Sequence, residues 1–139
     1  MTPAVCVAGA LGVASVVEDL RRRRVPNWLT AAGAAGGVAC AAAGGWHGLG
    51  IAAAGAMAGF LILLPCHWCG AMGGGDVKLM AAYGALLGPA GILLAAAFAA
   101  VIGALWAGGA LLWNPHRAAI PYAPAIVLGA WISLLGGGS

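Results

Sequence analysis

Asp19 and Asp76 are the residues whose types and settings could carry chemistry in this sequence. The chain has only three acidic residues, and the third, Glu18, directly precedes Asp19. Asp76 lies in "GAMGGGDVKLM", after three glycines and before Lys78, with long apolar runs on either side. An ionisable side chain is costly in apolar surroundings, so we expect these carboxylates to have a function.

Two carboxylates close together in a partly desolvated site can share one proton, because both do not easily ionise. The ionised one can take a proton from water, and the protonated one can donate to a carbonyl oxygen. Such a pair can hydrolyse a peptide bond without a covalent intermediate. The sequence has no strong serine or cysteine-histidine constellation, and "GGGD" lacks the GK[ST] ending of a phosphate loop. A role for Asp76 as a mere helix cap is less favoured, since Ser or Asn would cap at lower cost.

The elements that position these acids must be membrane helices. Hydrophobic residues form 63% of the chain and charged residues 6%, and the mean hydropathy is +1.02, whereas a soluble domain has about 25% charged residues. No formally charged residue occurs within 25–75 or 79–116, and one membrane helix needs only about 20 residues. The sequence predicts an all-α membrane bundle, with 1–139 as a single domain. Its small, localised net charge of +3 argues against a nucleic-acid partner.

Glycine, proline and charged residues divide the chain into about six predicted transmembrane helices. We expect them at 2–17, 26–45, 49–65, from 76 to the "LLGPAG" break, at 90–113 and at 122–135. The fourth is short for a full crossing. The loops after the first, third and fifth helices, with their edges, contain every basic residue: Arg21, Arg22, Arg23, Arg24, Lys78 and Arg117. The positive-inside rule then places these loops and all three acids at the cytoplasmic face, with both termini outside.

Three stretches together resemble a known family. "GGGDVKLMAA" is similar to the GxGD motif of membrane-embedded aspartic proteases, in the GxGDxK form of type IV prepilin peptidases. "EDLRRRRVPNWLT" resembles the first-aspartate region of those enzymes, and "IPYAPAIVLGA" resembles their last helix. The resemblance implies that Asp19 and Asp76 are the catalytic pair. It also assigns Gly73, Gly75 and Lys78 to the motif.

The longer prepilin peptidases have an extra region with two CxxC pairs and also N-methylate the pilin. Nothing in this sequence corresponds to that region, so the chain most resembles the compact Flp/Tad-pilus subtype. The implied substrate is a prepilin with a basic cytoplasmic leader and an apolar helix in the inner membrane, cleaved at the cytoplasmic face. No cofactor or metal is expected. "CHWC", with Cys66 and Cys69, could begin a zinc site with His67 and His116, but uncoordinated residues at a membrane boundary are the favoured interpretation.

Several roles stay open at this point. Lys78 either orients the site or an anionic substrate group, or anchors the cytoplasmic side. Asn27 could contact the substrate, although satisfying the backbone at the start of a helix is the favoured role, and Glu18 is expected to pair with Arg21 or Arg22. The alternative functions are a small membrane carrier or assembly subunit, or a preflagellin-type peptidase. The sequence does not indicate the oligomeric state.

Overall fold

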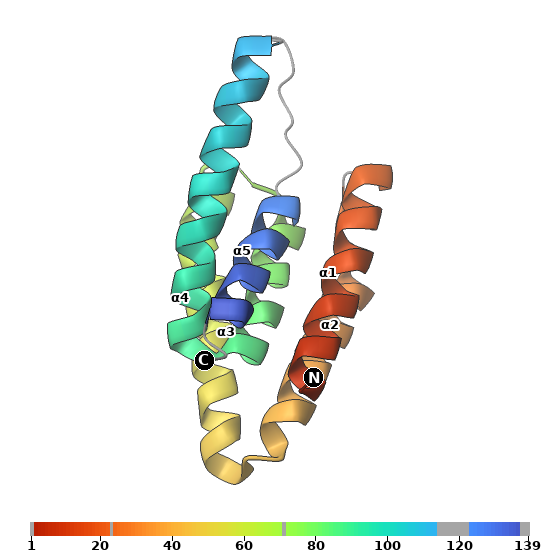
Figure 1. Cartoon of the computed structure of the whole chain (residues 1–139), viewed down its shortest axis with the longest axis vertical. Coiled ribbons are helices and arrows are strands. Elements are labelled where there is room, and N and C mark those ends of the chain that lie inside the picture. Colours follow the sequence, from red (N-terminus) through yellow and green to blue (C-terminus); the bar gives the residue numbers. More distant parts are fainter. Residues whose placement is uncertain (1, 23, 71, 114–122, 137–139) are drawn as a thin grey trace.

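The computed structural model describes residues 2–22, 24–70, 72–113 and 123–136, and it is helical almost throughout (Figure 1). The helices are α1 (Pro3–Arg22), α2 (Asn27–Ala42), α3 (Gly45–Trp68), α4 (Gly74–Trp113) and α5 (Ala123–Gly136). Successive helical segments alternate in direction. The end of α1, the end of α3 and the start of α4 therefore lie at one end of the bundle, and the α2–α3 turn lies at the other (Figure 1).

Local sequence signals determine where the first three helices start and stop. Arg21 and Arg22 occupy the last turn of α1, where positive charge is favourable against the helix dipole. Pro26 follows in an extended conformation, with φ −69° and ψ 144°, and α2 begins at the next residue. Gly45, the first residue of α3, has a φ of 68°, a conformation that suits glycine and allows the tight reversal after α2.

The α4 helix is interrupted at Gly88, which has a φ of 73° and a ψ of 176° and is followed by Pro89. A Cβ added to Gly59 of α3 would clash with the carbonyl oxygen of Met80 and would lie 3.2 Å from Cγ1 of Ile92. In a straight helix these two residues would be about 18 Å apart. The chain therefore reverses at Gly88, and the two parts of α4 run in opposite directions (Figure 1).

This interruption confirms the predicted break in "LLGPAG". The predicted sixth helix corresponds to α5, which is described from Ala123 to Gly136. The predicted start at Tyr122, together with Arg23, His116 and Arg117, falls outside the described residues.

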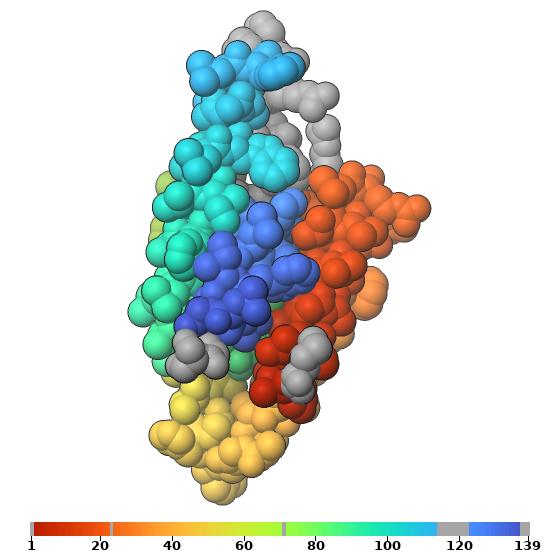
Figure 2. Space-filling model, in the orientation of Figure 1, coloured from red at the N-terminus to blue at the C-terminus, as the bar shows by residue number. Residues whose placement is uncertain are grey.

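The outer surface of the bundle is apolar, as expected for a membrane protein. Leu93 and Leu105 of α4 and Leu128 of α5 are 59%, 72% and 44% exposed. In Figure 2, α5 lies between α1 and the second part of α4. By length and composition, α1, α3 and α4 can cross a membrane, and α5 is shorter. The predicted all-α membrane bundle is confirmed, and the count of six crossings stays a prediction.

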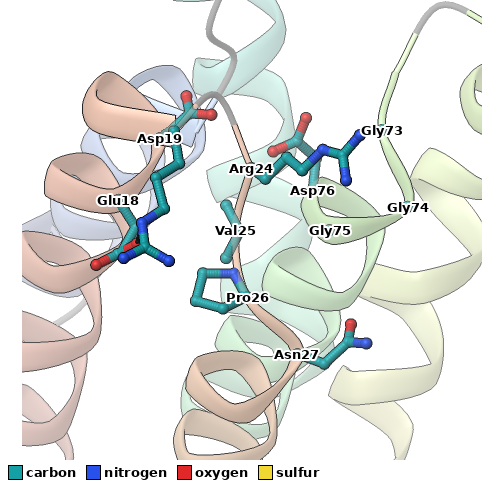
Figure 3. A pocket seen from close by; sticks show the side chains of 11 residues that line it. Glu18, Asp19, Arg24, Val25, Pro26, Asn27, Gly73, Gly74, Gly75 and Asp76 are labelled. Carbon is teal, nitrogen blue, oxygen red and sulfur yellow. Dashed lines mark ion pairs between the residues drawn. The ribbon is translucent and has the colours of Figure 1, made fainter.

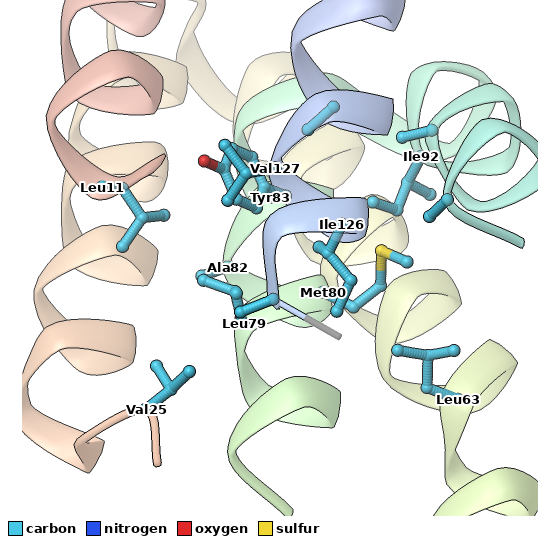
Figure 4. Packing of buried hydrophobic residues seen from close by; sticks show 14 of the residues in the cluster. Leu11, Val25, Leu63, Leu79, Met80, Ala82, Tyr83, Ile92, Ile126 and Val127 are labelled. Atoms are coloured by element: carbon cyan, nitrogen blue, oxygen red, sulfur yellow. The ribbon is translucent and has the colours of Figure 1, made fainter. Parts of the chain in front are cut away.

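Small residues bring the helices close together around one core. A Cβ on Gly55 of α3 would clash with the carbonyl oxygen of Gly84 in α4, so these two backbones are in direct contact, as in many packed membrane helices. Tyr83 is fully buried, and its hydroxyl donates a hydrogen bond of 3.1 Å to the carbonyl oxygen of Ala8 in α1. Figure 4 shows Tyr83 among side chains from α1, α4 and α5. The core therefore holds α1 and α4, which carry the two aspartates, against each other.

Candidate active site

A cavity of about 510 Å³ lies where α1 ends and α4 begins (Figure 3). Both aspartates line it, although 56 residues separate them in the sequence. The alternation of the helices brings them together, because the loops after the first and third helical segments are at the same end of the bundle. The lining residues are Glu18, Asp19, Arg22, Arg24, Val25, Pro26, Asn27, Gly73, Gly74, Gly75 and Asp76.

Asp19 lies in the last turn of α1, and its side chain is almost completely buried, with 6% exposed. Its carboxylate accepts a hydrogen bond from the backbone N–H of Ala123, the first residue of α5. The other oxygen, Oδ2, is buried and has no hydrogen-bond partner within the described part of the chain. The hydrogen bond from Ala123 thus holds the carboxylate in place, and Oδ2 accepts no hydrogen bond from the described part of the chain.

Asp76 lies in the first turn of α4, two residues after the helix begins at Gly74. Its backbone N–H donates to the carbonyl oxygen of Gly73 at 3.2 Å. Asp76 is therefore not the N-cap of this helix. Its partly buried carboxylate lies at the positive end of the helix dipole, which stabilises negative charge. The negative charges of Asp76 and Asp19 repel each other when both are ionised.

The two motif glycines have different surroundings. A Cβ on Gly75 would lie 3.0 Å from the carbonyl oxygen of Val25 and 3.3 Å from its Cβ. A Cβ on Gly73 would have nothing within 4 Å among the described atoms. The expected close approach of another backbone therefore occurs at Gly75, where the segment that links α1 to α2 packs against the first turn of α4.

Asn27 and Lys78 join α2 to α4 beside the cavity. The ammonium group of Lys78 donates a hydrogen bond of 2.9 Å to Oδ1 of Asn27. Within α2, the hydroxyl of Thr30 donates to the backbone carbonyl of Asn27 at 2.9 Å. The sequence favoured a side chain of Asn27 that satisfies backbone groups at the helix start. In the structure its amide oxygen accepts a hydrogen bond from Lys78 instead.

Glu18 forms the expected pair with an arginine. One of its carboxylate oxygens lies 3.4 Å from Nε of Arg22, one turn further along α1. Glu18 thus lines the cavity but has a cationic partner of its own, whereas neither aspartate has an ion pair within the described residues.

The sequence matches a known protein family over most of its length. Residues 6–108 match the model of the type IV leader peptidase family. The chain belongs to that family. A prepilin leader peptidase/N-methyltransferase of Aeromonas salmonicida strain A449 is 35% identical over 136 residues, which cover 91% of this chain and 47% of that protein. A protein of the same name from Aeromonas hydrophila has the same identity and coverage.

This leader peptidase family member spans about half the length of the curated relatives it matches. No solved structure matches the chain. The family identification agrees with the resemblance of "GGGDVKLMAA" and its companion stretches, and the match over 6–108 includes both aspartates.

Three contributors to the site were missed in the sequence. Arg24 was interpreted mainly as a topology signal, but it lines the cavity beside Asp76 in Figure 3. Val25 gave no signal beyond being apolar, yet it contacts Gly75. The Nδ1–H of His67 donates to the carbonyl oxygen of Met72 at 3.0 Å, and the ring lies 3.5 Å from where a Cβ of Gly74 would be. His67 of the "CHWC" stretch thus contacts the segment that leads into α4.

Proposed function

We propose that this protein is a membrane-embedded aspartic endopeptidase that removes the cytoplasmic leader from type IV prepilins. The observation that carries the proposal is the meeting of Asp19 and Asp76, from α1 and α4, at one cavity. These are two of only three acidic residues in the chain, and the third is paired with Arg22.

The reaction needs one ionised and one protonated carboxyl group. The ionised group takes a proton from a water molecule as the water oxygen attacks the carbonyl carbon of the scissile peptide. The protonated group gives its proton to the carbonyl oxygen, which produces a tetrahedral diol. Collapse of the diol breaks the C–N bond. The leaving amine receives a proton from the first carboxyl group, and the second carboxylate takes the proton of one diol hydroxyl, whose oxygen becomes the carbonyl oxygen of the product acid. The products are a carboxylic acid and an amine, and the pair again holds one proton.

The surrounding residues position this pair. Gly75 allows the Val25 backbone to pack against the first turn of α4, which fixes Asp76 relative to the α1–α2 linker. Gly73, which also lines the cavity, forms the non-helical approach to α4 and leaves space for a substrate backbone. The Lys78–Asn27 hydrogen bond fixes the start of α2 against α4. We assign no cofactor or metal to the reaction.

The names of the relatives and the positions of the basic residues support the substrate class. The relatives are named prepilin leader peptidases. The basic residues that the structure describes lie at the end of the bundle that contains the cavity, and they are Arg21, Arg22, Arg24 and Lys78. The positive-inside rule places that end in the cytoplasm of an inner-membrane protein, with both termini on the other side. A prepilin with a cytoplasmic leader and an apolar helix would present its cleavage point there. We assign the chain to the Flp/Tad-pilus type.

The test is cleavage of a prepilin by membranes that contain the protein. Asn is nearly isosteric with Asp and cannot ionise, so Asp19→Asn and Asp76→Asn should each abolish cleavage. General acid–base groups contribute about 10²–10⁴-fold, and the double variant should be hardly slower than either single variant, because the two groups act as a unit. Glu18→Gln is the matched control and should retain most activity.

The outcomes separate the alternatives. Cleavage at a near wild-type rate by Asp76→Asn would refute the aspartic-protease mechanism and favour a carrier or an assembly subunit. An inactive Glu18→Gln together with an active Asp19→Asn would keep the chemistry and change the acid. Preference for a preflagellin over a prepilin would keep both aspartates and change the substrate.

A further inference from the structure

An apolar groove of about 420 Å³ lies beside the aspartate cavity, between α2, α3 and α4. Its walls include Ala31 and Ala34 of α2, Phe60 of α3 and Ala81 of α4. Asn27 lines both the groove and the aspartate cavity. The two hollows therefore adjoin at Asn27, where α2 begins.

The lining of the groove is suited to binding an apolar helix. Alanine side chains on α2 and α4 let a neighbouring helix approach closely. Phe60 is 37% exposed and supplies an aromatic surface. The polar residues of the groove are Asn27, Thr30 and Lys78. The side chains of Lys78 and Asn27 are hydrogen-bonded to each other, and the Thr30 hydroxyl donates to the backbone carbonyl of Asn27. From Asn27 to Ala34 the groove follows α2 for about 10 Å, or two helical turns.

The part of the substrate that follows the scissile bond needs a binding site of this kind. In the proposed reaction the scissile bond occupies the cavity, and the chain beyond it continues as an apolar helix within the bilayer. That helix must leave the cavity along the outside of the bundle, since the core is filled by side chains such as Leu79 and Tyr83. The groove adjoins the cavity at Asn27, and apart from Asn27, Thr30 and Lys78 its lining is apolar.

We infer that the groove between α2, α3 and α4 binds the first turns of the apolar helix that follows the scissile bond. This inference rests on the proposed function and adds a substrate-binding site to it. The site selects substrates by the size of their side chains in these turns, because the alanine walls leave room for a closely packed helix.

The first test fills the groove without touching the cavity. Ala34→Phe places a large side chain in the groove, and Ala35→Phe places the same side chain on the next, exposed residue of α2, which does not line the groove. We expect Ala34→Phe to lower kcat/KM for prepilin by about tenfold or more, mainly through KM. Ala35→Phe should stay within about twofold of the wild type. Equal effects of the two changes would overturn the inference.

The second test needs no cleavage. In an Asp76→Asn background whose native cysteines are replaced by serine, Ala34→Cys is combined with single cysteines along the apolar helix of the prepilin. Oxidation should cross-link this cysteine to the first two turns after the cleavage point, and Ala35→Cys should cross-link much less. Cross-links to the distal part of that helix, or between two copies of the protein, would overturn the assignment.

The two proposals fail in different ways. If wild-type and Asp76→Asn membranes both leave prepilin intact, the proposed function fails. Cross-linking at Ala34 would still show that the groove binds an apolar helix. If the wild type cleaves prepilin and cross-links are as strong from Ala35 as from Ala34, the peptidase assignment stands and the groove assignment fails.

Discussion

Replacing Gly75 by alanine should slow peptide cleavage by pushing the α1–α2 linker away from the start of α4. The new Cβ would lie 3.0 Å from the carbonyl oxygen of Val25 and 3.3 Å from its Cβ. Carbon atoms prefer separations of about 3.5–4.0 Å, so the two segments must separate by a few tenths of an ångström. Val25 is buried, with 8% exposed, and its backbone has little room to yield.

The size of the effect follows from how sharply catalysis depends on geometry. A misplacement of about 1 Å can cost about 10²-fold in rate. A shift of about 0.3–0.5 Å between the start of α4 and the linker that follows the Asp19 turn of α1 should then lower kcat/KM about four- to tenfold. Stability should not fall in parallel, because alanine is more favourable than glycine inside a helix by about 0.5–1 kcal/mol.

The assay compares kcat/KM for a prepilin and thermal unfolding of the purified protein. Gly74→Ala is the matched control, since its Cβ would make an ordinary contact of 3.5 Å with the ring of His67, and it should retain most activity. The reasoning is refuted if Gly75→Ala cleaves at the wild-type rate, or if Gly74→Ala loses as much activity as Gly75→Ala.

Three further predictions follow from the contacts and charges around the site. Lys78→Met and Asn27→Ala should each lower kcat/KM several-fold. The double variant should be no worse than the single ones, because both changes remove the same hydrogen bond. Additive losses in kcat/KM would contradict this prediction. Replacing Cys66 and Cys69 with serine should leave most activity, measured on membranes with and without a chelator, and loss of wild-type activity on chelation with recovery by zinc would overturn it. A single cysteine at Arg117 should resist an impermeant reagent added outside whole cells, and its labelling would defeat the six-helix topology.

Much of the fold could be predicted because charge and breaker residues mark helix ends in an apolar chain. The reversal at Gly88 was visible as Gly-Pro within "LLGPAG", and glycine is the residue that tolerates its φ of 73°. The placement of Asp19 and Asp76 at one end of the bundle needed only the alternation of helices. The Glu18–Arg22 pair needed only the spacing of a helix.

The remaining contacts depend on how each helix is rotated about its axis, which a mostly apolar sequence does not record. Alanine and glycine occur on all sides of α2, so no apolar stripe indicated that Asn27 would face Lys78. The contact of Val25 with Gly75 joins a linker to a helix start 50 residues later. The role of His67 was hidden by its place in "CHWC", a spacing that suggests metal ligands.

The reversal at Gly88 also has a consequence for the lipid around the protein. The first part of α4, from Gly74 to the break, can extend only about 21 Å, against a hydrocarbon core of about 30 Å. Figure 1 shows this reversal well short of the α2–α3 turn, so this flank of the bundle stops before α2 and α3 do at the end away from the aspartates. A bilayer meets a short hydrophobic flank by thinning locally. The protein would then sit in a one-sided depression beside Gly88, which brings the water boundary on the side away from the aspartates closer to the middle of the bundle.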